Sequence, residues 1–137
     1  NKQADYIGKA ALEAAREQVE AGNPPYRTQL VGLIFGGNPI DDYAPDFWLV
    51  GDTADAEPVG YVTSPWYSPE LQTNVALAHV PVGRTGIGEE YWIHLPQQYA
   101  QTPDTPIRAE IAEVPFRPSV NPNQREILKS KGLDAAV

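Results

Sequence analysis

Two adjacent aromatic residues are the first candidates for binding chemistry in this chain. Trp66 and Tyr67 stand between Pro65 and Pro69. Prolines on both sides predict a loop, where large rings are hard to bury. Because flat heteroaromatic ligands stack on aromatic rings, Trp66 and Tyr67 are candidate walls of a cofactor or substrate pocket. The alternative is that both rings plug one end of the fold.

Arg117 is the third candidate pocket residue. It follows Pro115-Phe116 and precedes Pro118. An arginine held between prolines has little conformational freedom to lose, which suits it to fixing a carboxylate group. A salt bridge to another part of the protein would explain the same arrangement, and both roles stay open.

Catalytic and metal-binding patterns are missing from the sequence. His79 and His94 fall in candidate strands without acids at ligand spacing, so we expect surface or hydrogen-bonded roles for them. Asp41-Asp42 beside Tyr43 is expected to be a solvated turn, with a contact to a polar ligand as the alternative. We therefore assign no catalytic residue and no metal site to these residues.

Composition narrows the classes of partner. The 137 residues carry a formal charge of -8, so neither nucleic acid nor an acidic membrane surface is an expected partner. No apolar run approaches the roughly 20 residues that span a bilayer. The chain has no cysteine, which fits a reducing compartment, and we expect a cytoplasmic protein. It also has no methionine, and we interpret it as the C-terminal part of a longer protein.

The pattern of apolar residues predicts a helix followed by strands. Helical spacing runs from Asp5, the expected N-cap, to Gly22, and the helix should pack on a neighbour. From about Thr28 the period changes to two, and turn-rich connectors without helices favour a mostly β fold with an antiparallel six-stranded barrel. A short C-terminal helix is expected between Asn121 and Gly132. The candidate strands are Gln29–Phe35, Phe47–Asp52, Val59–Ser64, Asn74–Val80, Glu90–Leu95 and Pro106–Val114.

One candidate strand keeps a face of unusually small side chains. Ala76 and Ala78 share one face of the strand Asn74–Val80, because strand side chains alternate. So small a face admits a close neighbour. The connector that follows, Gly83–Gly88, is rich in glycine, but it lies between strands rather than before a helix, so we expect a turn and not a phosphate-binding loop.

Four sequence blocks, in order along the chain, carry a family resemblance. They are Tyr6-Ile7-Gly8-Lys9 with Ala11-Leu12, Leu30–Leu33, Gly60–Pro81 and Pro115–Pro118, and the third block is the most specific. Together they resemble the C-terminal barrel domain of the glycine cleavage T-protein family, whose members are tetrahydrofolate-dependent one-carbon transferases.

The resemblance implies that this chain is one side of a larger site. In such an enzyme tetrahydrofolate would occupy a central cavity that this barrel closes, and the catalytic acid would lie upstream. The expected partners are the missing N-terminal folate-binding portion and a small-molecule methyl donor. The implied parts are a helix and linker from the preceding domain at 1–27, the C-terminal β-barrel domain at 28–118 and a helical tail at 119–137.

Two departures from the T-protein pattern favour a particular branch of relatives. The connector from Leu95 to Pro106 is long, and the tail beyond Pro118 adds a helix. Both favour the folate-dependent demethylases, and among them an O-demethylase that moves methyl from a methoxylated aromatic acid to tetrahydrofolate. The alternatives are an aminomethyltransferase of glycine cleavage, a dimethylsulfoniopropionate demethylase, or a non-catalytic folate-binding relative.

Overall fold

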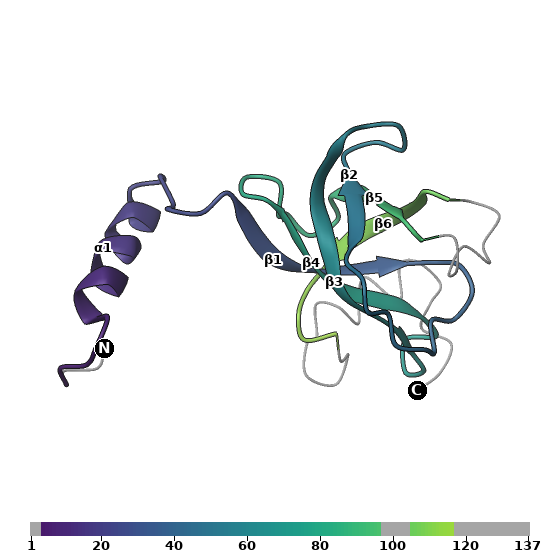
Figure 1. Ribbon diagram of the computed structural model, residues 1–137, viewed down its shortest axis with the longest axis horizontal. Coiled ribbons are helices and arrows are strands. Elements are labelled where there is room, and N and C mark those ends of the chain that lie inside the picture. Colours follow the sequence, from purple (N-terminus) through teal and green to yellow (C-terminus); the bar gives the residue numbers. More distant parts are fainter. Residues whose placement is uncertain (1–3, 97–104, 117–137) are drawn as a thin grey trace.

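Alternating apolar and polar residues after Thr28 produce a closed barrel of antiparallel strands. The structure is a computed structural model that describes residues 4–96 and 105–116. The predicted mostly β, six-stranded antiparallel barrel with an N-terminal helix is confirmed, whereas the predicted C-terminal helix lies outside the described residues. The elements are α1 (Lys9–Glu20), β1 (Thr28–Phe35), β2 (Trp48–Gly51), β3 (Pro58–Ser68), β4 (Thr73–Pro81), β5 (Glu90–His94) and β6 (Ile107–Ala112) (Figure 1).

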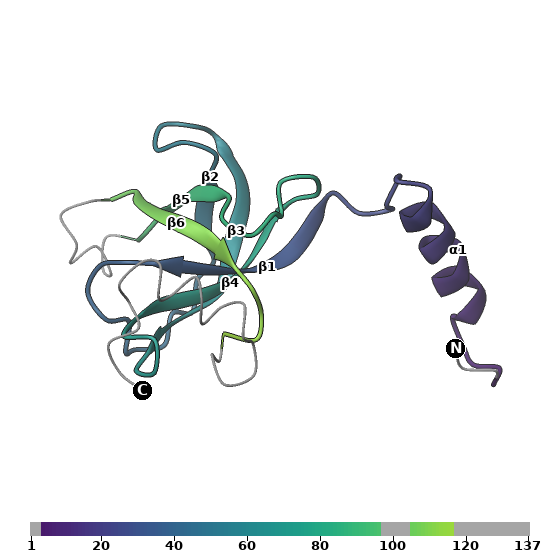
Figure 2. The same cartoon turned by 180° about the vertical axis from the view of Figure 1, so that it is seen from behind.

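The order of strands around the barrel differs from their order in the chain. Going round, the order is β1-β4-β3-β2-β5-β6, and β6 pairs with β1 to close the barrel (Figure 2). Because β4 and β3 lie between β1 and β2, the connection at 36–47 must cross one end of the barrel, and we call it the crossing connection. The connection at 82–89, which leads from β4 to β5, must cross the other end.

The interior of the barrel explains the small face of β4. Ala76 lies opposite Leu33 of β1, and Ala78 lies opposite Val62 of β3. Both alanines are fully buried, so the close neighbour expected from the sequence is the barrel's own core. The buried core consists of Val31, Leu33, Phe35, Ile40, Trp48, Val50, Val62, Ala76, Ala78, Val80, Tyr91, Ile93, Leu95, Ile107, Ala109 and Ile111.

The predicted loop around Trp66 is wrong, because β3 continues through it to Ser68. Beyond Val62 the strand keeps only β4 as a neighbour, since β2 pairs with β3 no further than Val62. Proline is tolerated along such an unpaired edge because its missing N–H is not needed there. A register shift between Val62 and Ser64, just before Pro65, marks a β-bulge. Pro65 therefore indicated an edge and not a loop, whereas Pro69 lies in the turn that follows β3.

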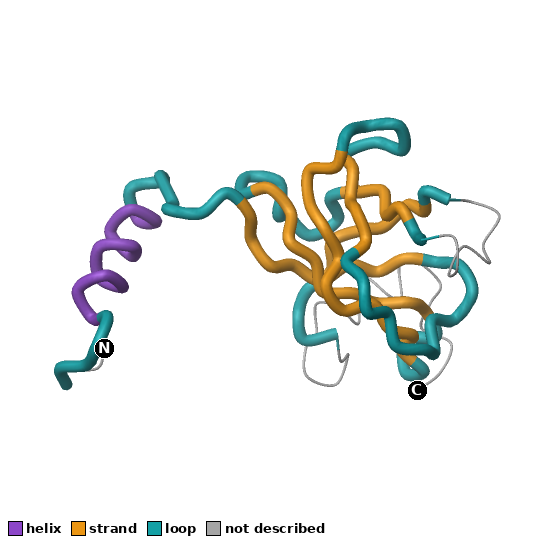
Figure 3. Tube along the Cα trace, viewed as in Figure 1, coloured by secondary structure: helices purple, strands orange, loops and turns teal. Residues whose placement is uncertain are grey.

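Helix α1 begins later than expected and buries none of its residues. Gly8 and not Asp5 takes the N-cap position, with no side-chain cap. The predicted end is confirmed: Gly22, at a φ of 74°, follows the helix, and its N–H donates to the Val19 carbonyl at 3.0 Å. Figure 3 shows this helix apart from the strands, with the linker between them.

We predict that Gly60→Ala strongly destabilises the barrel. A Cβ at this position of β3 would lie far inside the contact distance of the His79 backbone oxygen on β4, which cannot move without breaking the ladder. We expect a loss of roughly 2–3 kcal/mol in the free energy of unfolding, measured by urea denaturation. Gly36→Ala is the matched control, because no atom lies within 4 Å of its added Cβ. Equal stability of the two variants would contradict this account of the β3–β4 approach.

Candidate functional site

A hollow beside β3 brings together two segments that are distant in the sequence. Its volume is about 300 Å³. The crossing connection supplies Tyr43 and Ala44, and β3 supplies residues 63–66, from Thr63 to Trp66. Trp66 is half exposed, so about half of the surface of this large aromatic residue is available to a ligand. The hollow therefore offers a flat aromatic wall next to the hydroxyl groups of Thr63 and Ser64.

The two candidate aromatics face opposite sides of β3. Trp66 lies opposite Val75 on the outer face, whereas Tyr67 lies opposite the buried Asn74 and points toward the end of the barrel. Of the two, only Trp66 lines the hollow. The half-buried Tyr67 has a position that fits the alternative role of closing the barrel end. Strand alternation, which a predicted loop does not have, is what separates them.

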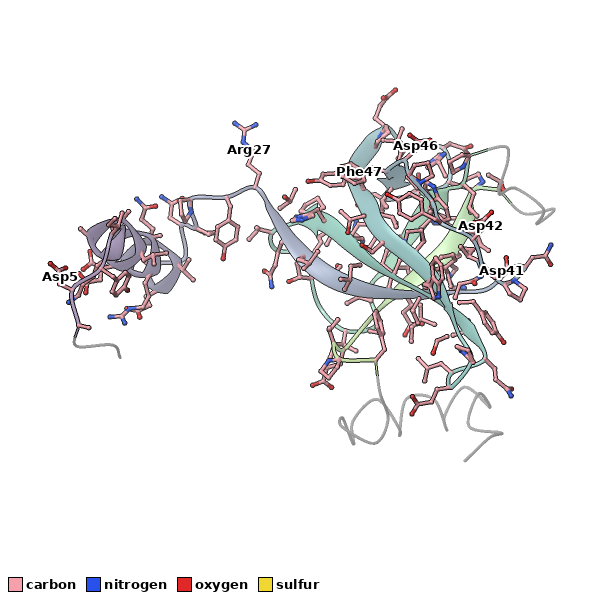
Figure 4. All side chains as sticks on the ribbon, turned by 60° about the horizontal axis from the view of Figure 1, so that its bottom comes forward. Asp5, Arg27, Asp41, Asp42, Asp46 and Phe47 are labelled. Atoms are coloured by element: carbon pink, nitrogen blue, oxygen red, sulfur yellow. The ribbon has the colours of Figure 1, made fainter. Side chains whose placement is uncertain are left out.

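Sequence reasoning missed most of the lining of the hollow. The sequence predicts a solvated turn at Asp41-Asp42 beside Tyr43, and both aspartates are exposed. The Asp42 carboxylate accepts a hydrogen bond from the Tyr43 N–H at 2.8 Å. Figure 4 shows the acidic side chains of this connection along one side of the barrel. The only signal for Tyr43 was its place in a connector, and no periodicity links that connector to Trp66.

Arg117 lies outside the described residues, but the segment that leads to it can be placed. The ring of Phe116 lies over Gly32 of β1, where an added Cβ would come within 2.7 Å of it. Gly32 lies opposite Leu77 of β4, which lies opposite Ser64 of β3. Phe116 is thus on the same outer row as the hollow, about two strand spacings or ~10 Å from Ser64.

An aromatic row crosses the outer face of the barrel next to this region. The Tyr61 ring stacks on Phe47 with centroids 5.4 Å apart and on His79 at 5.2 Å. The register aligns Leu30, His79, Tyr61 and Leu49 across four neighbouring strands. Leu30 and Leu49 are half exposed. His79, expected at the surface or in a hydrogen bond, is half-buried on the outer face and stacks on a ring.

A second hollow, of about 710 Å³, lies where β5 and β6 meet the end of β1. Gly36, Gly37 and Trp92 line it together with residues 105–108. Its cation, Arg108, already pairs with the Glu90 carboxylate on the neighbouring strand. With that pairing the second hollow presents less free charge to a ligand than its composition indicates.

Arg84 organises a polar cluster at the opposite end of the barrel from the crossing connection. It pairs with Asp52 and with Glu89, the latter at 3.2 Å, and its guanidinium lies 5.0 Å from the centroid of the Tyr91 ring. The Tyr91 hydroxyl donates to the Arg84 carbonyl oxygen at 2.7 Å. Burial raises the pKa of the Tyr91 phenol above its ordinary value, the Arg84 charge lowers it in part, and Asp52 and Glu89 add to the rise. These contacts fix the turn at 83–88, which the sequence predicted as a turn.

The described part of the chain contains neither a metal-ligand cluster nor a membrane-crossing helix. Across residues 4–96 and 105–116, no three histidine, aspartate or glutamate side chains come together as ligands for a metal ion. Over the same residues, no helix has the length and apolar character needed to cross a membrane. The candidate functional site is the Trp66 hollow, which is lined by Tyr43, Ala44 and residues 63–66.

Comparison with known proteins identifies the family. Residues 28–116 match the family model described as the glycine cleavage T-protein C-terminal barrel domain. The chain belongs to this family. The resemblance seen in the four sequence blocks is confirmed, and the matched range begins at the first residue of β1.

Members of the T-protein family that resemble this chain are much longer. An aminomethyltransferase from Koribacter versatilis is 35% identical over 122 residues, which cover 88% of this chain and 25% of that protein. One from Listeria monocytogenes serotype 4b is 38% identical over 117 residues, 84% of this chain and 27% of that protein. The chain thus spans about a quarter of the length of these curated relatives.

A solved structure in the T-protein family shares the fold. It is the glycine cleavage system aminomethyltransferase T from Bartonella henselae, with a TM-score of 0.53 and 23% sequence identity. The match covers 80% of this chain and 28% of that one. At this identity the likeness supports the barrel and not a shared substrate.

The raised pKa of the Tyr91 phenol predicts a loss of stability at high pH. Its pKa is raised in the folded state, so below the unfolded value of about 10 both states keep the proton, and above it the unfolded state loses the proton first. The free energy of unfolding should therefore fall as pH rises through the folded pKa, and fall less in Tyr91→Phe. Urea denaturation from about pH 8 to about pH 11 measures this. Tyr26→Phe, at a half-exposed linker tyrosine, is the control and should decline like the wild type; identical curves for wild type and Tyr91→Phe would contradict the prediction.

Proposed function

We propose that this chain is the C-terminal barrel of a longer tetrahydrofolate-dependent one-carbon transferase of the aminomethyltransferase type. The observation that carries the proposal is the match of residues 28–116 to the T-protein barrel, supported by relatives that bear the name aminomethyltransferase. Those relatives are enzymes, and this chain corresponds to about a quarter of their length. The barrel's part would be to position ligands and exclude water, with the reacting groups supplied by the rest of the protein.

The O-demethylase hypothesis is the weaker of the two. It depended on the connector from Leu95 to Pro106 and on the tail beyond Pro118. Residues 97–104 and 117–137 lie outside the described part of the structure, and the relatives reported above are named aminomethyltransferase. Nothing in the described residues favours a methoxylated aromatic acid or dimethylsulfoniopropionate as donor.

The Trp66 hollow fits one part of a folate and not the whole molecule. Its indole face suits stacking against a flat ring, and Thr63 and Ser64 have hydroxyl groups that accept hydrogen bonds. Its volume of about 300 Å³ is at the small end for a ligand pocket, so most of the cofactor would contact other parts of the enzyme. When bound, tetrahydrofolate supplies the nitrogen that takes up the one-carbon unit. The residues of this chain would hold it in place.

The partner we propose is the portion of the same protein that precedes the barrel. Leu12 and Val19 of helix α1 are exposed, as is Ile7 just before it, and an isolated helix of 12 residues is marginal in water. The outer aromatic row begins at Leu30, two residues after the linker enters β1 at Thr28. Exposed apolar faces of this kind mark interaction surfaces. We place the domain boundary at residue 28, with residues 1–27 belonging to the preceding portion.

We predict that Trp66→Ala in the longer protein weakens tetrahydrofolate binding. Loss of the stacking face should raise the KM for tetrahydrofolate about three- to tenfold, with a smaller effect on kcat, as measured by steady-state kinetics. Trp92→Ala is the matched control, because Trp92 lines the other hollow. A wild-type KM in Trp66→Ala, or an equal rise in Trp92→Ala, would count against the Trp66 hollow as part of the folate site.

We predict that the longer protein accepts a glycine-cleavage aminomethyl donor. Calorimetry and turnover assays with tetrahydrofolate should be run against this donor, a set of methoxybenzoates and dimethylsulfoniopropionate. Binding and turnover of the aminomethyl donor alone is the expected result, and demethylation of a methoxybenzoate would instead support the O-demethylase hypothesis. The 137-residue chain by itself is the control: it should fold and show no turnover with any of them. Turnover by the chain alone would overturn the assignment of its role.

A further inference from the structure

Asn74 is out of place in the apolar interior of the barrel. Among the described residues it is the one buried side chain that is neither apolar nor aromatic, with 2% of its surface exposed. It lies near the start of β4, points inward, and is opposite Phe35 on one side and Tyr67 on the other. A buried amide is costly unless its donors and acceptor are all bonded, so its partners explain its presence.

All three partners of the Asn74 amide lie in one short stretch of the crossing connection. Its Oδ1 accepts from the Ile40 N–H at 3.0 Å. Its Nδ2 donates to the carbonyl oxygens of Gly36 at 2.9 Å and of Asn38 at 3.0 Å. This requires an acceptor and two donors on one short side chain, which an amide has and a carboxylate, a hydroxyl or an alkyl group does not.

Ile40 links the hydrogen bonds of Asn74 to strand β3. Its carbonyl oxygen accepts from the Tyr67 N–H at 2.8 Å, and its side chain is buried in the core. The connection is thus bonded to the inside of β4 through Asn74 and to the edge of β3 through Tyr67. Three and four residues further on, Tyr43 and Ala44 form the wall of the hollow that faces Trp66, and Ala44 packs on the core.

We propose that Asn74 is a positioning residue that holds the crossing connection against β3 and so sets the shape of the Trp66 hollow. Its side chain hydrogen-bonds the connection at Gly36, Asn38 and Ile40, and it acts on the hollow through Ile40. The positioning of the connection stands on the hydrogen bonds alone. Its consequence for ligand binding rests on the proposed function.

The first test measures the exchange of backbone amide hydrogens in the 137-residue chain. Asn74→Leu keeps the core filled and removes all three bonds. If Asn74 positions the connection, exchange at the Tyr67 amide should rise at least about tenfold, although that amide does not bond Asn74, while amides in the middle of β1 and β4 stay protected. An unchanged Tyr67 amide would overturn the proposal.

Two further variants keep this test decisive. Asn74→Asp keeps the acceptor for Ile40 but replaces the NH2 group, and with it both donors, by one carboxylate oxygen that faces the Gly36 and Asn38 carbonyls, and it should also release the Tyr67 amide. If Asn74→Leu does not fold, Asn74→Asp provides the measurement. Thr73→Val is the matched control: it removes the bond from the neighbouring hydroxyl to the Phe35 carbonyl, at 2.9 Å, and should leave Tyr67 exchange at the wild-type rate. Equal release in Thr73→Val would show general loosening and overturn a specific role for Asn74.

The second test measures coupling to Trp66 in the longer protein. Asn74→Leu should raise the KM for tetrahydrofolate about fivefold, and adding Trp66→Ala should raise it by less than the product of the two single effects, because both act through one hollow. In the double variant of Asn74→Leu with Trp92→Ala, the two single effects on the KM should multiply in full. A released Tyr67 amide with an unchanged KM would overturn the link to folate binding, and with it the role proposed for the hollow, while the positioning of the connection would stand.

Discussion

The volume available inside a closed barrel of six strands constrains everything else in this structure. The interior must take the rings of Trp48 and Tyr91, and both are completely buried. Space for them comes from the small inward face of β4 at Ala76 and Ala78, because small and large side chains must alternate to fill a small barrel. A larger residue at either alanine would push β4 away from β1 and β3. This packing sets the positions of the strands, and so the geometry of the outer face that bears the hollow and the aromatic row.

The two ends of the barrel are held by different chemistry. At one end, a neutral amide inside the core bonds backbone groups of the crossing connection, and all of its donors and acceptors are used. At the other end, the half-exposed Arg84 pairs with two carboxylates and caps the Tyr91 ring. Salt screens exposed ion pairs but not a buried amide. The end that supports the hollow is therefore held independently of ionic strength.

The sequence was sufficient for the barrel but not for the site. Period-two alternation located all six strands to within a few residues, and Gly22 marked the end of α1, because these signals are local. Trp66 and Tyr67 were misplaced in a loop, since proline is read as a strand breaker unless the strand is known to lie at an edge. Tyr43 and Ala44 could not be connected with Trp66, because only the order of strands around the barrel brings the connection across β3. The family resemblance supplied the class of chemistry, which no local pattern contains.

The pairing of β1 with β6 has a consequence for synthesis of the protein. The first strand of the barrel bonds with the last, whose final residue is Ala112, so closure joins parts of the chain that leave the ribosome far apart in time. Until β6 emerges, one edge of β1 keeps its peptide groups unpaired beside an incomplete core, the condition in which nascent chains associate wrongly. Folding dominated by such distant contacts is slow. A chaperone that shields this edge during translation would act on the most vulnerable species of this domain.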